Sequence, residues 1–279
     1  MRVGLIDVDG HNFPNIPLMK ISSWHKKHGD FVEWYNPMIS GHMDKVYKSK
    51  VFSFSDDYLY HIDADEIIEG GSSVYGITDT AYGFLSRGCP RHCSFCHVGA
   101  KEGLNSKKVA DLEEFWQGQK NIVICDPNIL ACRQWKDLLQ QLIDSKALIN
   151  INQGMDIRLM TEAKAEMIKK IKLKTLHFAW DRYEDKNIIL PKLKMFKYIT
   201  GIDIRKLIVY VLCNYDTTIE QDLERIYTLR EMGYWGYVMI YDKESLPKGH
   251  VLRKMERWVN NRFIFASCDK FEDYLGRKK

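Results

Sequence analysis

From residue 81 towards the C-terminus, short apolar runs alternate with stretches whose apolar residues recur at helical spacing. Such alternation is typical of parallel β-α units, and six of them are expected in this chain. The predicted strands are residues 81–85, 121–125, 148–152, 175–180, 207–212 and 237–241. The predicted helices are residues 106–116, 135–143, 161–171, 188–198, 217–232 and 251–259.

The fifth of these helices carries the clearest end signals. Thr217 and Glu220 have the spacing of a capping box, and Gly233 follows the last apolar position. The whole pattern predicts an α/β protein with a six-stranded parallel sheet. Periodicity by itself fits an open doubly wound sheet as well as a barrel-like one.

The first 75 or so residues follow a different pattern, and with 279 residues the chain has room for about two domains. We expect a short β-α-β module at residues 1–76, before a larger domain at residues 77–279 that ends in a helix. The module is predicted to contain a strand at 2–8, a helix at 16–28 that Gly29 stops, strands at 31–35 and 50–54, and a loop or edge element at 66–75.

Three cysteines lie in one loop directly after the predicted strand 81–85. Cys89, Cys93 and Cys96 have the spacing Cys-x3-Cys-x2-Cys and supply three thiolates. A closed tetrahedral zinc site or a fully protein-ligated 4Fe-4S cube needs four ligands, so one coordination position is left open. A zinc knuckle with His97 as fourth ligand is the alternative, although adjacent Cys96 and His97 are awkward ligands for one ion.

With the aromatic Phe95 just before its last cysteine, this loop resembles the signature motif of the radical S-adenosylmethionine (radical SAM) superfamily. The resemblance implies a 4Fe-4S cluster on Cys89, Cys93 and Cys96, with S-adenosylmethionine on the open iron. It also implies reductive cleavage to a 5'-deoxyadenosyl radical that abstracts hydrogen from a substrate, and an external one-electron donor such as flavodoxin or ferredoxin. It further favours a (β/α)6 partial TIM-type barrel over the open sheet.

Polar residues end the predicted strands, where ligands collect in parallel β-α proteins. By the resemblance, Phe95 lies against the adenine and Asp181 lies where ribose hydroxyls bind. The family's Gly-Gly-Glu stretch falls at residues 125–128, which points to Asp126 or Asn128 as the partner of the cofactor's amino group. The predicted cofactor-binding residues are Phe95, Asp126, Asn128, Gln153, Asp156, Arg158, Asp181 and Asn214.

For Arg158 and for two cysteines, a structural role is the alternative to a functional one. Arg158 could clamp a ligand carboxylate in a bidentate manner or form a surface pair with Asp156. Cys125 and Cys213 end two predicted strands. They are candidate hydrogen donors or radical sites, and burial as small apolar side chains is the alternative.

The N-terminal module resembles a reduced cobalamin-binding-like Rossmann domain. Asp9 and His11 match the acid and the histidine of the motif Asp-x-His-x-x-Gly, but Pro14 stands at the glycine position. Cobalamin is therefore an unlikely cofactor. A cobalamin-dependent radical SAM methyltransferase and a non-enzymatic zinc module that binds nucleic acid are the alternative functions.

Composition sets broader limits. The net charge is 41 minus 37, or +4, and the basic residues are scattered, so nucleic acid is not indicated as a partner. Seven cysteines, three of them clustered, do not resemble a disulfide framework. No apolar run is long enough to span a membrane and the N-terminus lacks a signal-peptide core, so we expect a cytoplasmic protein without a membrane partner.

Overall fold

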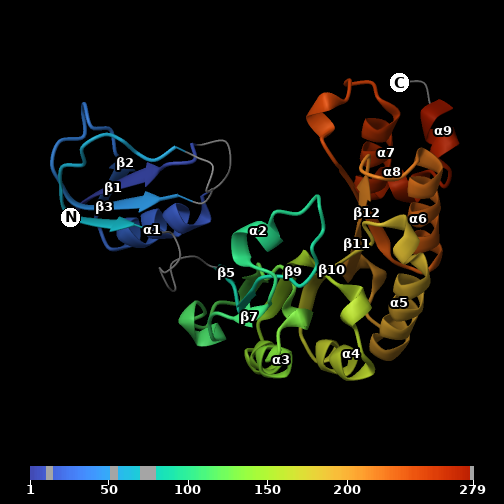
Figure 1. Cartoon of the computed structure of the whole chain (residues 1–279). Helices are drawn as coiled ribbons and strands as arrows, with labels where there is room; N and C mark the ends of the chain where they lie inside the picture. Colours follow the sequence, from blue (N-terminus) through green and yellow to red (C-terminus); the bar gives the residue numbers. More distant parts are fainter. Residues whose placement is uncertain (11–14, 51–55, 70–79, 277–279) are drawn as a thin grey trace. The chain divides into compact units, whose positions relative to one another are not determined.

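The computed structural model describes residues 1–10, 15–50, 56–69 and 80–276. The chain divides into two compact units (Figure 1), one of residues 1–81 with 113–119 and one of residues 82–112 with 120–279. The predicted domain boundary between residues 76 and 77 lies outside the described residues. Within those residues, no helix has the length and apolar character needed to cross a membrane.

The first unit contains a four-stranded parallel sheet in the order β2-β1-β3-β4, with helix α1 between β1 and β2. Asn15 begins α1, since its side chain accepts a hydrogen bond from Leu18 N at 3.2 Å. The same side chain donates to Asp7 Oδ1 and Ser49 Oγ, which fixes the helix start to the ends of β1 and β3. The elements are β1 (Arg2–Asp7), α1 (Ile16–Lys27), β2 (Phe31–Trp34), β3 (Met43–Ser49) and β4 (Ala64–Glu69).

The predicted strand 50–54 is not the third strand of this sheet. Strand β3 ends at Ser49, and residues 51–54 lie outside the described residues. The sequence pattern does not reveal β3, because buried Val46 lies between Lys45 and Tyr47, and Lys45 and Lys48 form ion pairs with β4. The predicted loop or edge element at 66–75 is confirmed as an edge strand over residues 66–69, and residues 70–75 are not described.

The second sheet is parallel and six-stranded, and its order β5-β8-β9-β10-β11-β12 follows the chain. A doubly wound sheet reverses its strand order at a switch point, and this sheet does not. All six predicted strands occur in it, with ends shifted by a few residues. They are β5 (Thr80–Gly83), β8 (Asn121–Ile124), β9 (Leu148–Met155), β10 (Leu173–Ala179), β11 (Leu207–Cys213) and β12 (Trp235–Ile240).

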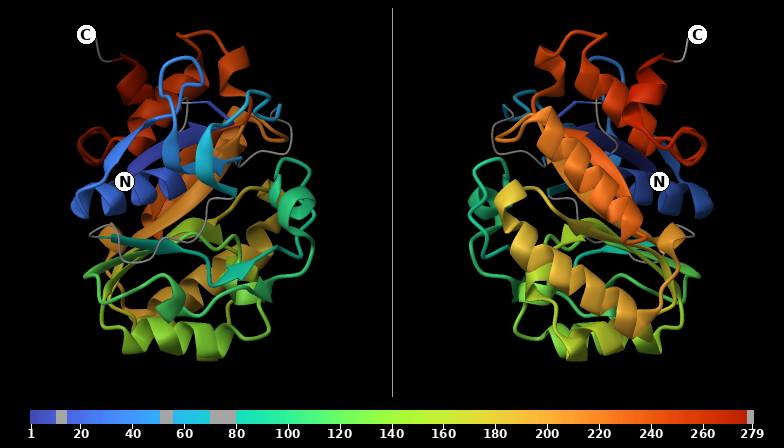
Figure 2. Two further views of the ribbon diagram at one scale, coloured as in Figure 1. Left: turned by 90° about the vertical axis from the view of Figure 1, so that its left-hand side faces the viewer. Right: turned by 90° about the vertical axis from the view of Figure 1, so that its right-hand side faces the viewer.

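Helices cover one face of this sheet. Consecutive helices α3, α4 and α5 pack side by side, and α6 contacts β11 and β12 (Figures 1 and 2). Their apolar stripes are buried, and α7 packs on β12 with Trp258 against Phe265 and Phe271. The helices are α3 (Trp135–Asp144), α4 (Glu162–Lys169), α5 (Lys186–Thr200), α6 (Ile219–Glu231), α7 (Val251–Asn260), α8 (Arg262–Ser267) and α9 (Phe271–Gly276).

The prediction of a helix at residues 106–116 is wrong. The segment contains the short strand β7 (Lys107–Lys108), which pairs with β6 (Ser86–Arg87), and the 3₁₀-helix η1 (Leu112–Glu114). Its apolar spacing is helical, but Val109 N donates to Leu85 O and Leu112 N donates to the Gln141 side chain. A short helix, α2 (Val98–Glu102), instead follows the cysteine loop.

The capping box of α6 lies one residue later than predicted. Thr218 Oγ1 accepts from Gln221 N at 3.3 Å, and the Gln221 side chain accepts from Thr218 N at 3.0 Å. The hydroxyl of Thr217 donates instead to Asp222 at 2.7 Å. Two adjacent threonines made the register ambiguous in sequence.

Replacing Thr218 with alanine should remove this cap and lower the free energy of unfolding by about 1 kcal/mol, as urea denaturation would measure. Thr218→Ser keeps the hydroxyl and is the control, so it should remain close to the wild type. An alanine variant as stable as the wild type would contradict the observed register.

Candidate functional site

A buried carboxylate fixes the start of the cysteine loop. Asp126 follows β8 and is 1% exposed, and it accepts hydrogen bonds from Leu85 N, Ser86 N and Ser86 Oγ at 2.6–2.7 Å. Burial raises its pKa to about 6, although the three hydrogen bonds act in the opposite direction. Both oxygens of Asp126 thus bind the segment that leads into the loop, and its predicted contact with the cofactor stays a prediction.

The loop then needs a glycine immediately before its first cysteine. Gly88 has a φ of +88°, and a Cβ there would lie 2.3 Å from the backbone oxygen of Asn105. Gly88 N donates to Glu102 Oε2 and Cys89 N donates to Gly103 O, each at 3.1 Å. The segment after α2 therefore folds back against the loop and holds Cys89 in place.

The three cysteines are accessible thiols. Cys89 and Cys93 are half-buried, Cys96 is exposed, and none of the seven cysteines forms a disulfide. Asn128 is buried and donates to Cys89 Sγ at 3.4 Å, while its Oδ1 has no hydrogen-bond partner among the described residues. Burial is the main cause that raises the pKa of Cys93, and Asp181 adds to it, which places that carboxylate near the thiol.

Three thiols share one loop, and thiolates are ligands of iron-sulfur clusters and of zinc alike. Across the part of the chain that the structure describes, no three His, Cys, Asp or Glu side chains are arranged to hold a metal ion. Neither the three loop thiols alone nor these thiols together with His97, which precedes α2, form such a group. The loop is thus anchored at its ends while its thiols are not gathered at one point.

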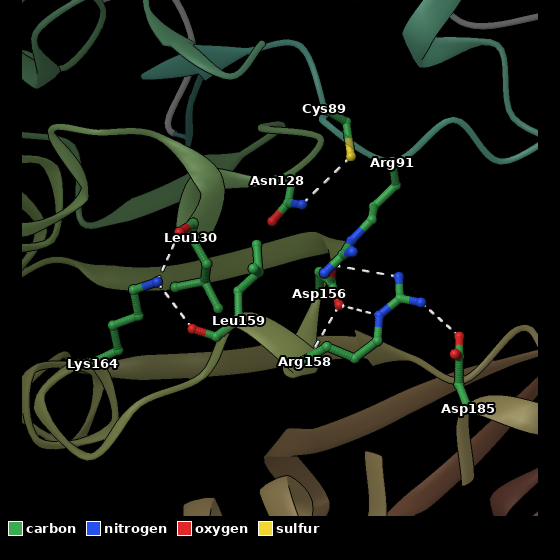
Figure 3. A network of polar contacts seen from close by, with 9 residues as sticks. All are labelled: Cys89, Arg91, Asn128, Leu130, Asp156, Arg158, Leu159, Lys164 and Asp185. Carbon is green, nitrogen blue, oxygen red and sulfur yellow. Dashed lines mark hydrogen bonds and ion pairs between the residues drawn. The ribbon is translucent and has the colours of Figure 1, made fainter. Parts of the chain in front are cut away.

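An ion network ties the middle of the loop to β9. Asp156 is 8% exposed and follows β9, where its Oδ2 accepts from Arg91 Nε at 2.6 Å and its Oδ1 accepts from Arg158 Nε at 2.7 Å (Figure 3). Arg158 also donates to Asp185 at 2.6 Å. The Asp156–Arg158 pair is therefore real, but it is part of a partly buried network and not an isolated surface pair.

A pocket of about 460 Å³ opens beside the second half of the loop. Ser94 Oγ and Tyr215 OH are 2.5 Å apart, and the rings of Phe95 and Tyr215 meet edge to face at 5.2 Å. Tyr215 was missed by the sequence analysis, although its place next to Asn214 after a strand was the signal that could have found it. The pocket is lined by His92, Cys93, Ser94, Phe95, Arg182, Tyr215 and Asp216.

Three other predicted residues lie at strand ends. Asp181 follows β10, and burial raises its pKa to about 6 against the opposing effect of Arg225 and Arg158. Asn214 has a φ of +67° and donates to Tyr241 O at 2.8 Å, which joins the ends of β11 and β12. Gln153 is exposed near the end of β9.

The two strand-end cysteines differ from each other. Cys213 is fully buried, and burial raises the pKa of its thiol, so it packs as a small apolar side chain. Cys125 is half-buried, and its backbone N donates to Gly83 O at 2.9 Å between β8 and β5. The hydrogen-donor roles proposed for both residues stay predictions.

Arg225 on α6 holds two strand ends together. Its guanidinium is 0% exposed and donates to Trp180 O, Asp181 O and Leu212 O at 2.7–2.9 Å, and to Asp222 Oδ1 at 2.5 Å. These carbonyls belong to the ends of β10 and β11, from which Asp181 and the segment with Tyr215 project. The sequence does not reveal that Arg225 binds these carbonyls, because an arginine at its position in the helix would also suit an exposed helix face.

The chain matches no protein-family model, and no curated protein matches it. The predicted cobalamin motif also has no structural account, because residues 11–14 lie outside the described residues.

Arg225→Met should lower the free energy of unfolding by about 3–5 kcal/mol, because Asp222 would remain as a buried, unpaired charge. Chemical denaturation measures this loss. Arg205 is the matched control, since its pair with Asp203 is exposed at the surface, and Arg205→Met should stay close to the wild type. Equal losses in the two variants would contradict the role of Arg225.

Proposed function

We propose that this chain is a radical SAM enzyme, which uses a 4Fe-4S cluster to cleave S-adenosylmethionine reductively and abstract hydrogen from a substrate. The observation that carries the proposal is the position of the Cys-x3-Cys-x2-Cys loop. The loop leaves the first strand of a parallel six-stranded sheet, and buried carboxylates at the ends of β8 and β9 anchor it.

Cys89, Cys93 and Cys96 are the residues that would hold the cluster. When bound, the cluster supplies the electron for cleavage and an open iron for the methionine part of the cofactor. Asn128 already donates a hydrogen bond to Cys89 Sγ, and such bonds to ligating sulfurs tune cluster potentials. By the family resemblance, the electron comes from an external one-electron donor such as flavodoxin or ferredoxin.

The pocket beside the loop is a suitable place for the nucleoside part of S-adenosylmethionine. Phe95 and Tyr215 present two aromatic surfaces at its wall, and aromatic faces bind planar bases well. Asp181 lies within electrostatic reach of Cys93 and could accept hydrogen bonds from ribose hydroxyls. These are the roles that the family resemblance implies for Phe95 and Asp181.

The same proposal extends to the architecture of the second unit. Six parallel strands in chain order, with crossover helices packed side by side, are compatible with a (β/α)6 partial barrel. In such a barrel the carboxyl ends of β8 to β12 would surround the cofactor pocket.

The triple variant Cys89→Ala, Cys93→Ala and Cys96→Ala should lose the cluster and with it all formation of 5'-deoxyadenosine. The measurement is anaerobic reconstitution followed by visible absorption, iron analysis and product assay with dithionite. Cys268→Ala is the control, because Cys268 lies between the C-terminal helices α8 and α9 and its thiol donates to Lys270 O. A triple variant that still binds a cluster and makes 5'-deoxyadenosine would contradict the proposal. Tightly bound zinc without iron in the wild-type protein would favour the zinc module.

Arg91→Met should release the middle of the cysteine loop from Asp156. We expect the reconstituted cluster to be lost to a chelator about threefold to tenfold faster than in the wild type, because a charge-assisted hydrogen bond is removed. The decay of visible absorption measures this rate. Arg133→Met changes an exposed arginine just before α3 and is the control. Equal decay rates in the two variants would show that the network does not support the cluster.

A further inference from the structure

The sheet of the second unit has a face that its helices do not cover. In β11, Leu207, Val209, Val211 and Cys213 are fully buried, and α6 packs on this strand. Side chains alternate across a strand, so Tyr210 and Leu212 belong to the opposite face. In β12 the exposed residues Tyr237 and Met239 share that face, at 41% and 47% exposure.

Aromatic rings cross this face from strand to strand. His177 on β10 stacks on Tyr210 with ring centroids 5.1 Å apart and an interplanar angle of 14°. Tyr210 meets Tyr237 edge to face at 5.7 Å and donates its hydroxyl to Asn152 O on β9 at 2.7 Å. Gly154 makes this possible, because a Cβ at that position would lie 3.2 Å from the Tyr210 ring.

His177 carries an acceptor that no described residue uses. Its Nδ1 lies 2.7 Å from Ile151 O, and a carbonyl only accepts, so Nδ1 bears the proton of this hydrogen bond. Burial lowers the pKa of His177 below its usual value despite the opposing effect of the hydrogen bond to Ile151 O, and Arg262 adds to the effect of burial, so the neutral ring predominates at pH 7. Nε2 is then an acceptor, and it has no hydrogen bond to the described part of the chain.

Asn152 supplies a second acceptor of this kind. Its Oδ1 is buried and finds no hydrogen-bond partner among the described residues. Burial alternates along Ile149, Asn150, Ile151 and Asn152, which places Asn152 on the same face as Asn150. A buried acceptor without a donor destabilises the protein, so a ligand that supplies the donor gains from binding there.

The strand side chains around His177 carry no charge, although the guanidinium of Arg262 on α8 lies over the ring of Trp235 at 5.1 Å, at the edge of this face. We call the uncharged part of the face the uncharged face and define it by Asn150, Asn152, Thr175, His177, Tyr210, Tyr237 and Met239. None of these side chains is ionised at neutral pH once His177 is neutral. Its rings can stack on a ligand and its two open acceptors can bind donors, whereas none of these seven side chains would pair with a phosphate, a carboxylate or an ammonium group.

We propose that the uncharged face binds the substrate of the radical reaction, and that this substrate presents an uncharged planar ring with at least two N–H or O–H donors. This inference rests on the proposed function, since it identifies the substrate class for the same enzyme. Tyr210 and Tyr237 form the wall for the ring, and His177 Nε2 and Asn152 Oδ1 accept its hydrogen bonds.

Two small probes test this on the full chain. Uracil is an uncharged planar ring with two N–H donors, and 1,3-dimethyluracil has the same ring without them. A ligand-observed NMR titration should show that uracil binds and that 1,3-dimethyluracil binds about threefold to tenfold more weakly. Equal affinities for the two probes, or no binding of uracil, would overturn the proposal.

Variants locate the binding to this face. Tyr237→Ala changes a partly exposed side chain and should weaken uracil binding about threefold to tenfold. The matched control is Tyr198→Ala, since Tyr198 on α5 is 91% exposed and lies on another element. His177→Phe keeps a ring and removes the acceptor, so it should reduce the preference for uracil. An unchanged uracil affinity in Tyr237→Ala overturns the proposal.

The triple cysteine variant separates this inference from the proposed function. No residue of the uncharged face belongs to the cysteine loop, so the triple variant should bind uracil as the wild type does. Uracil binding without any 5'-deoxyadenosine from the wild type would support the face and refute the radical SAM assignment. Formation of 5'-deoxyadenosine without uracil binding would support the enzyme and refute the face.

Discussion

The candidate site depends on one buried carboxylate, that of Asp156. Its two oxygens accept from Arg91 inside the cysteine loop and from Arg158 after β9, so one group joins a long loop to the sheet. A buried carboxylate is tolerated only with such partners, and removal of one partner typically costs about 3–5 kcal/mol. The loop position is therefore coupled to the packing of β9.

Buried charged groups also bind the chain at the other strand ends. Asp126 after β8 binds the backbone of Leu85 and Ser86, and Arg225 binds carbonyls at the ends of β10 and β11. Each contact replaces water at backbone groups that β-α loops leave unpaired. The carboxyl edge of the sheet is thus held by charged groups beneath its surface, which leaves the thiols and the residues around the pocket accessible.

The sequence predicted the regular elements well because their signals are local. Strand 207–212 and helix 251–259 occur almost as expected, since an apolar run and a helical apolar stripe need no information from distant residues. The prediction of a helix at 106–116 was wrong because Val109 and Leu112 form hydrogen bonds with Leu85 and Gln141, which are distant in the sequence. The roles of Asp126 and Arg225 were unpredictable for the same reason.

The proposed cluster loop was easier to foresee from the sequence than the proposed substrate face. Cysteines at a fixed spacing form a motif within eight residues, Cys89 to Cys96. His177, Tyr210 and Tyr237 are one residue from each of three strands, and they meet only because parallel register places Tyr210 opposite Tyr237 and beside β10. Their chemistry depends on that register and on the neutral state of His177, so a register shift of one residue in any of these strands would turn its ring toward the helices.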